Sequence, residues 1–256
     1  MNTSPELTFT IEITQEASEI FRRYFGNAPS TWKSDNTPVT QGDTEINDLI
    51  IKRINERFPN DEVLGEESSN TLHSRRVWVV DPIDGTQPFE NGIPVSTIVI
   101  AAIEDGVVQL AVVYEPMLGD LYYAERGKGA YKNGVRIQCN TRDSAGQSYF
   151  ATSSLLPVGY ASVGEIHDKI ERAKGKTFNF RSYTYSAMKV AEGRLCAATL
   201  GIGRPYDIAA PALIVEEAGG IATDLDGKPL DFSKGSAGIV VSNGPLHTTF
   251  LEYIQK

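Results

Sequence analysis

Apolar residues at the start of the chain recur at the spacing of an amphipathic helix. In residues 4–25, and again in residues 44–58, they fall three or four positions apart and so share one helical face. The proline and asparagine at positions 59 and 60 are expected to end the second helix. The buried face of the first helix is predicted to consist of Leu7, Ile11, Ile13, Ala17, Ile20, Phe21 and Tyr24.

Short apolar segments follow, as expected for strands. They cover residues 77–80, 95–104, 107–114 and 121–125. The pairs Asp105-Gly106 and Asn133-Gly134 separate apolar segments, and both tolerate the positive φ angles that a tight hairpin turn needs. We therefore predict antiparallel hairpins at these two positions.

The second half of the chain alternates between the two patterns. Strands are predicted at residues 149–153, 178–180 and 194–200, and helices at residues 163–173 and 184–192. A further helix is expected to open at Asp207 and to stop at Gly219-Gly220, with Pro211 in its first turn. Two more strands and a helix over residues 246–254 complete the pattern, which favours helices layered over two sheets.

The composition is that of a soluble globular protein. Of the 256 residues, 41% are hydrophobic and 22% are charged, and no repeat or linker divides them. We expect one domain over residues 1–256, in which residues 1–145 and 146–256 pack as one unit. The net charge of −9 argues against nucleic-acid polymers, and no apolar run is long enough to span a membrane.

Cysteines, histidines and the N-terminus carry little functional signal. Cys139 and Cys196 lie outside any C-x-x-C or Cys/His cluster, which favours reduced, buried thiols but leaves a disulfide between them open. His73, His167 and His247 are expected to be surface or loop residues rather than ligands. The first residues lack a basic region followed by an apolar stretch, so we expect a cytoplasmic protein.

Chemistry concentrates in the segment Trp78-Val-Val-Asp81-Pro-Ile-Asp84-Gly-Thr86. Asp81 is expected where the apolar strand leaves the core, because proline cannot continue a ladder. Two carboxylates, the Ile83 carbonyl, the Thr86 hydroxyl and the Gly85 amides together suit divalent cations plus a phosphate. A plain surface turn explains the segment about equally well when it is taken alone.

Three more segments accompany this one along the chain: Thr37-Pro-Val-Thr-Gln-Gly-Asp43, Gly65-Glu-Glu-Ser68 and Pro205-Tyr-Asp207, the last leading into Ala218-Gly-Gly220. In this order, the four segments resemble the inositol monophosphatase family of magnesium-dependent, lithium-sensitive phosphomonoesterases, over nearly the whole chain. The resemblance implies an α/β (α+β) fold, a layered αβαβα sandwich with two β-sheets, as in fructose bisphosphatases. It also implies a homodimer that hydrolyses a small phosphorylated metabolite with two or three Mg²⁺ ions.

Residue roles follow from the resemblance. The metal ligands it implies are Glu66, Asp81, the Ile83 carbonyl, Asp84 and Asp207, while Asp43 and Thr86 orient the attacking water. It implies direct in-line attack by a metal-bound water, without a phospho-enzyme. Oxygen-only ligation favours Mg²⁺ over zinc or copper. Without the resemblance, Asp207 is better explained as a helix cap, and Asp43 as the cap of a helix from Thr44.

The substrate side departs from the family. Substrate contacts are predicted at Asp84, Gly85, Thr86, Ser182, Tyr183, Leu200 and Arg204. Pro88 replaces the asparagine common before Phe89, and Leu200 replaces a glutamate that binds sugar hydroxyls. Leucine accepts no hydrogen bond, so inositol 1-phosphate is not expected to be the best substrate, and Leu200 is expected to suit a flatter one. Arg204 is as well explained by a solvated loop as by a role in the pocket.

Three functions therefore stay open. The first is hydrolysis of an inositol- or sugar-like phosphate. The second is the same chemistry on histidinol phosphate or a nucleotide 3′-phosphate, and the segments Phe180-Arg-Ser-Tyr183 and Ala191-Glu-Gly193 resemble the histidinol-phosphate branch. The third is a catalytically silent binding or scaffold protein, against which the clustered acids count because unpaired carboxylates are costly without a metal.

Overall fold

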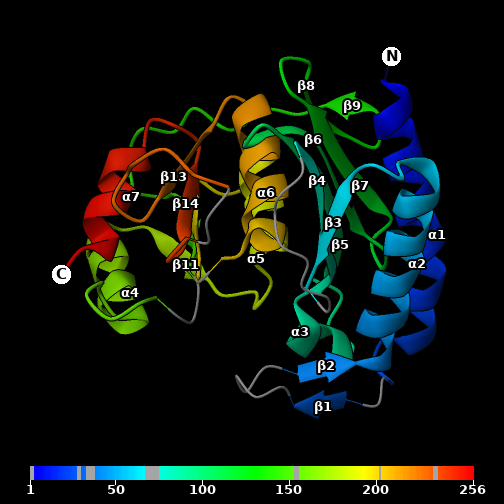
Figure 1. Cartoon of the computed structure of the whole chain (residues 1–256). Helices are drawn as coiled ribbons and strands as arrows, with labels where there is room; N and C mark the ends of the chain where they lie inside the picture. Colours follow the sequence, from blue (N-terminus) through cyan, green and yellow to red (C-terminus); the bar gives the residue numbers. More distant parts are fainter. Residues whose placement is uncertain are drawn as a thin grey trace.

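The computed structural model describes residues 3–27, 30–32, 38–66, 75–152, 156–201, 203–232 and 236–256. Within these residues, helices and sheets stack in alternating layers (Figure 1). The predicted αβαβα sandwich with two sheets is confirmed. The prediction for His73 falls outside the described residues.

The larger sheet has seven strands and is covered on one face by helices α1 (Pro5–Tyr24) and α2 (Gln41–Arg57). Its strands, in spatial order, are β3 (Glu62–Gly65), β4 (Arg76–Asp84), β5 (Thr97–Glu104), β6 (Val107–Glu115), β7 (Asp120–Glu125), β8 (Gly129–Lys132) and β9 (Val135–Arg136). Helix α3 (Thr86–Glu90) follows β4 directly, near the small hairpin of β1 (Ser30–Trp32) and β2 (Pro38–Thr40).

The smaller sheet has five strands. In spatial order they are β11 (Lys176–Phe178), β10 (Tyr149–Ala151), β12 (Ala197–Leu200), β14 (Ile239–Ser242) and β13 (Ile221–Asp224). Helices α5 (Tyr183–Ala191) and α6 (Pro205–Glu217) lie between the two sheets, and α4 (Val163–Arg172) and α7 (His247–Ile254) cover the outer face. Helices α5 and α6 therefore contact both sheets.

Strand β4 shows how the layers divide the core. Val77 and Val79 face the cluster between the sheets, whereas Trp78 and Val80 face the cluster beneath α1 and α2. Successive strand residues point to opposite faces, so a strand buried on both faces is a continuous apolar run.

Two strand predictions can be compared with the structure in detail. Both predicted hairpins are confirmed: Asp105 and Gly106 have φ of 50° and 78°, and Asn133 and Gly134 have φ of 49° and 81°. The prediction that β4 ends at Asp81 is wrong. The strand continues to Asp84, and Pro82 is tolerated because the register against β5 shifts between Asp81 and Asp84.

Helix α6 begins earlier than predicted. Arg204 is its N-cap and Pro205 its first residue, so Asp207 lies at the third position and Pro211 lies inside the helix rather than in its first turn. The paired glycines end it as predicted. The Gly219 amide donates to the Glu216 carbonyl and the Gly220 amide to the Val215 carbonyl, the two bonds of a Schellman cap.

Both cysteines are free thiols, Cys196 buried and Cys139 half-buried. Among the described residues, we find no helix with the length and apolar character needed to span a membrane.

We expect Gly220→Ala to destabilise the fold. A Cβ at Gly220 would lie 2.3 Å from the Ser242 carbonyl oxygen and 2.6 Å from a Val215 methyl group. Because an overpacked site must shift, the free energy of unfolding should fall by about 1–3 kcal/mol in urea titrations. Gly164→Ala in α4 is the control, since its Cβ would meet no atom within 4 Å. Equal stability of the two variants would contradict the crowding at Gly220.

Candidate active site

Glu66 and Asp81 are neighbours because β3 and β4 run parallel. Gly65 pairs with Val80, so the next residue of each strand emerges at the same edge of the sheet. The Glu66 amide still donates to the Val80 carbonyl at 3.0 Å. Two acids distant in sequence are thus brought together by strand pairing alone.

The irregular end of β4 carries the next groups. Asp81 is 3% exposed, and its carboxylate accepts the Ile83 amide at 3.1 Å. The Thr86 hydroxyl donates to the Ile83 carbonyl at 3.3 Å. These two bonds fix the backbone of residues 81–86, while the Ile83 side chain packs in the cluster beneath α1 and α2.

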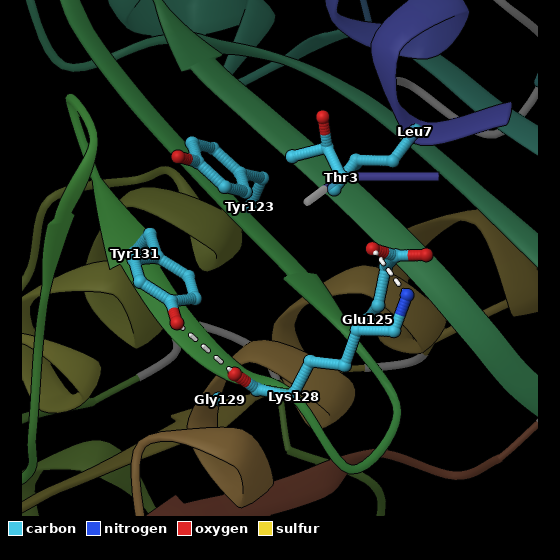
Figure 2. A pocket seen from close by; sticks show the side chains of 7 residues that line it. All are labelled: Thr3, Leu7, Tyr123, Glu125, Lys128, Gly129 and Tyr131. Carbon is cyan, nitrogen blue, oxygen red and sulfur yellow. Dashed lines mark hydrogen bonds and ion pairs between the residues drawn. The ribbon is translucent and has the colours of Figure 1, made fainter. Parts of the chain in front are cut away.

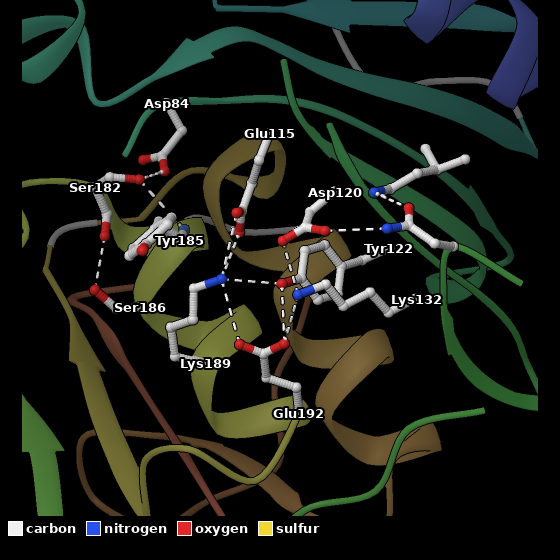
Figure 3. Close-up of polar contacts among 12 residues, drawn as sticks. Asp84, Glu115, Asp120, Tyr122, Lys132, Ser182, Tyr185, Ser186, Lys189 and Glu192 are labelled. Atoms are coloured by element: carbon white, nitrogen blue, oxygen red, sulfur yellow. Dashed lines mark hydrogen bonds and ion pairs between the residues drawn. The ribbon is translucent and has the colours of Figure 1, made fainter. Parts of the chain in front are cut away.

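Asp84 is bound to the start of helix α5. Its carboxylate accepts the amides of Tyr183 and Thr184 at 3.1 and 2.9 Å. It also accepts a hydrogen bond from the Ser182 hydroxyl (Figure 3). Gly85 lies against the same serine, since a Cβ there would be 2.8 Å from the Ser182 Cβ. With φ of 84° as well, this position requires glycine.

Asp43 and Asp207 occupy equivalent places in two helices. Each is the third helical residue, and each carboxylate accepts the backbone amide of the N-cap residue, Thr40 at 2.8 Å and Arg204 at 2.7 Å. The prediction that either acid is itself the N-cap is wrong. Both nevertheless stabilise helix starts, as a capping-box acid does.

Five predicted acids lie in one site, where the charges of four of them affect the pKa of Asp81. Burial raises the pKa of Asp81 well above its usual range, and the charges of Glu66, Asp84, Asp207 and Asp43 raise it further. Burial also raises the pKa of Asp207 and of Asp84, although hydrogen bonds from α5 oppose the rise at Asp84. Mutual repulsion of this kind favours a compensating cation.

The donor set fits a divalent cation by kind and by backbone placement, since it consists of carboxylates, a carbonyl and a hydroxyl. The side-chain rotamers fit less well. Among the described residues, no group of three or more His, Cys, Asp or Glu side chains is arranged as ligands of one ion. Asp43, Asp84 and Asp207 accept helix-start amides, and each carboxylate keeps further lone pairs that are available to a cation.

The predicted substrate wall is partly wrong. Leu200 lies in β12 with 0% exposure, inside the cluster between the sheets, so it offers no surface to a ligand. Tyr183 is half-buried, and Arg204 is exposed.

Arg181 is a residue that the sequence analysis did not assign. It is exposed, and its guanidinium donates two hydrogen bonds to the Gln87 side chain of α3, at 3.0 and 2.8 Å. Its φ of 60° is unusual for a residue with a side chain. Its position directly before Ser182 was the available signal, but only the fold shows that it reaches α3.

Other candidate features lie elsewhere. His247, predicted to be a surface or loop residue, is buried and joins Thr223 to Ser242.

A separate pocket of about 150 Å³ lies between the start of α1 and strands β7 and β8 (Figure 2). It contains no predicted site residue, and it is lined by Thr3, Leu7, Tyr123, Glu125, Lys128, Gly129 and Tyr131.

Comparisons with known proteins agree with this geometry. The model of the inositol monophosphatase family matches residues 2–256. A histidinol-phosphatase of Chlorobaculum parvum is 35% identical over 232 residues, 88% of each chain. A fructose-1,6-bisphosphatase/inositol-1-monophosphatase of Thermotoga maritima is 31% identical over 253 residues, 98% of this chain and 96% of the relative. The solved structure of a Thermotoga maritima IMPase superposes with a TM-score of 0.90 at 30% identity, covering 98% of this chain and 96% of that one. The chain belongs to the inositol monophosphatase family of phosphomonoesterases.

Proposed function

We propose that the protein is a Mg²⁺-dependent phosphatase that hydrolyses a small phosphorylated metabolite by direct, in-line attack of water. One observation carries the proposal: buried Asp81 is surrounded by the charges of Glu66, Asp84, Asp207 and Asp43. A silent scaffold has no need for such a cluster, which costs stability unless cations offset it.

The cations would be held by Glu66, Asp81, the Ile83 carbonyl, Asp84 and Asp207. When bound there, Mg²⁺ would lower the pKa of the attacking water and stabilise charge on the phosphate and the leaving group. Strand pairing of β3 with β4 and the start of α6 set the spacing of these ligands.

We assign Asp43 and Thr86 to orienting the attacking water. The Thr86 hydroxyl donates its hydrogen to the Ile83 carbonyl, so its oxygen can accept a hydrogen bond from water. Asp43 is buried at 1% exposure and held by Thr40, which fixes a second acceptor nearby.

The phosphate would lie against the backbone of Gly85 and Thr86. The left-handed conformation of Gly85 turns the chain into α3, a position where amides are available to oxygen atoms. Helix α3 has only five residues, so individual amide donors matter more here than a helix dipole.

The substrate proposal rests on Arg181. This exposed cation is bound to Gln87, two residues after the Gly85 backbone proposed to hold the phosphate, and favours a substrate with a second anionic group. A fructose-1,6-bisphosphatase/inositol-1-monophosphatase among the relatives is consistent with such a substrate. Histidinol phosphate is the second candidate, supported by the 35% identity with a histidinol-phosphatase.

We also propose that the enzyme works in the cytoplasm as a homodimer, as the family resemblance implies. Two free thiols are consistent with a reducing compartment.

Chelation should abolish turnover of an aryl phosphate, and Mg²⁺ should restore it, because the acids cannot replace the cation's charge.

Asp207→Asn should lower kcat by about 10² or more at saturating Mg²⁺. Glu165→Gln is the matched control, since Glu165 is also the third residue of its helix and accepts the N-cap amide at 2.7 Å. If both variants keep wild-type turnover and differ only in melting temperature, Asp207 is merely a capping residue.

Mg²⁺ should raise the melting temperature more at about pH 8 than at about pH 6. The folded-state pKa of Asp207 is raised from 3.8 to about 8. Between pH 3.8 and about pH 8, Asp207 is deprotonated in the unfolded protein but still protonated in the folded one. The stability of the metal-free protein therefore falls as the pH rises through this range. Melting in chelator and in Mg²⁺ at both pH values measures this, and an equal Mg²⁺ effect at both would contradict it.

Replacing Arg181 should lower kcat/KM more for bisphosphate substrates than for monophosphates. Arg181→Gln should lower kcat/KM for fructose 1,6-bisphosphate and adenosine 3′,5′-bisphosphate by roughly tenfold or more. The kcat/KM for inositol 1-phosphate and for histidinol phosphate should change little. Arg172→Gln is the control, because Arg172 is an exposed arginine of α4, on the outer face of the smaller sheet. A wild-type preference for inositol 1-phosphate by tenfold would exclude the bisphosphate proposal.

A further inference from the structure

A second buried polar cluster lies at the other end of helix α5 (Figure 3). The Lys189 ammonium contacts the Glu115 carboxylate at 3.0 and 3.3 Å and the Tyr122 hydroxyl at 2.9 Å. Only 11% of the Lys189 side chain and 1% of the Glu115 side chain are exposed. The ammonium also lies 4.4 Å from the centre of the Tyr185 ring.

The cluster extends to strand β8. Glu192, the C-cap residue of α5, contacts Lys189 at 3.4 Å and Lys132 at 2.8 Å, and Lys132 also contacts Asp120 at 2.7 Å. Three carboxylates therefore share two ammonium groups. Glu115, Asp120 and Lys132 belong to the larger sheet, so the cluster fastens the end of α5 to that sheet.

Helix α5 is thus held to one sheet at both ends. Ser182, Ser186 and Lys189 follow at spacings of four and three, which places them along one face of the helix. Ser182 bonds to Asp84 at the end of β4, and Lys189 bonds to Glu115 at the end of β6. Lys189 follows Ser182 by seven positions, about 10 Å of rigid helix, so a shift at one end moves the other.

We propose that Lys189 is a positioning residue, which sets the place of α5 and thereby the Ser182 hydroxyl and the Tyr183 and Thr184 amides on Asp84. The proposal rests on the proposed function, in which Asp84 is a metal ligand. Groups that orient a ligand govern metal affinity without touching the metal. Lys189 acts one step further away, through the helix itself.

The charge balance explains why a cation is needed at this place. Burial raises the pKa of Glu115 to about 7, and the Lys189 ammonium opposes that rise. Glu115 and Glu192 approach Lys189 from opposite elements, and without the ammonium they would repel each other across Tyr122. The end of α5 would then move away from the sheet.

The test compares Lys189→Met with Asp120→Asn. Both change the charge of the cluster by one unit, Lys189→Met towards negative and Asp120→Asn towards positive. Asp120 contacts Lys132 and Asn133 and does not contact α5. Lys189→Met should raise the Mg²⁺ concentration for half-maximal thermal stabilisation by about fivefold or more, less than the 10–100-fold typical of a direct partner of a ligand. Asp120→Asn should stay within about twofold of wild type, on the same scale. Turnover titrated with Mg²⁺ should show the same shifts.

Equal shifts in the two variants, or an unchanged Mg²⁺ requirement in Lys189→Met, would overturn the proposal. Should Lys189→Met fail to fold, Glu115→Gln replaces it, because the amide keeps the shape and weakens the hold on the ammonium. An unchanged Mg²⁺ requirement in Glu115→Gln would then overturn it equally. Wild-type protein that neither turns over nor gains stability with Mg²⁺ would instead contradict the proposed function.

Discussion

Asp84 joins the two halves of the chain. Its carboxylate belongs to the end of β4, yet it accepts two amides and a hydroxyl from the first turn of α5, about a hundred residues later. Burying a carboxylate is unfavourable unless hydrogen bonds satisfy it. The small space that Gly85 leaves for Ser182 permits this contact, so the position of α5 and the geometry of the acidic site depend on the same few atoms.

Fold and chemistry share groups in other parts of the site as well. Asp43 and Asp207 stabilise the starts of α2 and α6 while adding charge to the surroundings of Asp81. A carboxylate at a helix start is favoured by the exposed amides there, which partly offsets the repulsion between the acids. Substitution of such an acid therefore affects stability and chemistry together, and only a matched capping residue in another helix separates the two effects.

Much of the fold could be predicted because its signals are local. Helical and strand periodicity located the elements, and Asp-Gly and Asn-Gly located the hairpins. The start of α2 was missed because the spacing from Thr40 to Asp43 is a capping box, which places the helix start before the acid rather than at it. Pro82 was expected to end β4, but a register shift absorbs a proline inside a strand.

The site divides in the same way. The types and order of the oxygen donors can be read from the sequence, and they indicate the inositol monophosphatase family and its phosphate chemistry. Which side chains face one another depends on tertiary structure. Leu200 occupies a motif position, but the packing of β12 in the smaller sheet buries it. Arg181 meets Gln87 because Asp84 binds the start of α5 to the end of β4, which α3 follows directly. Local sequence sets donors and turns, but burial and charge coupling arise only between segments that folding brings together.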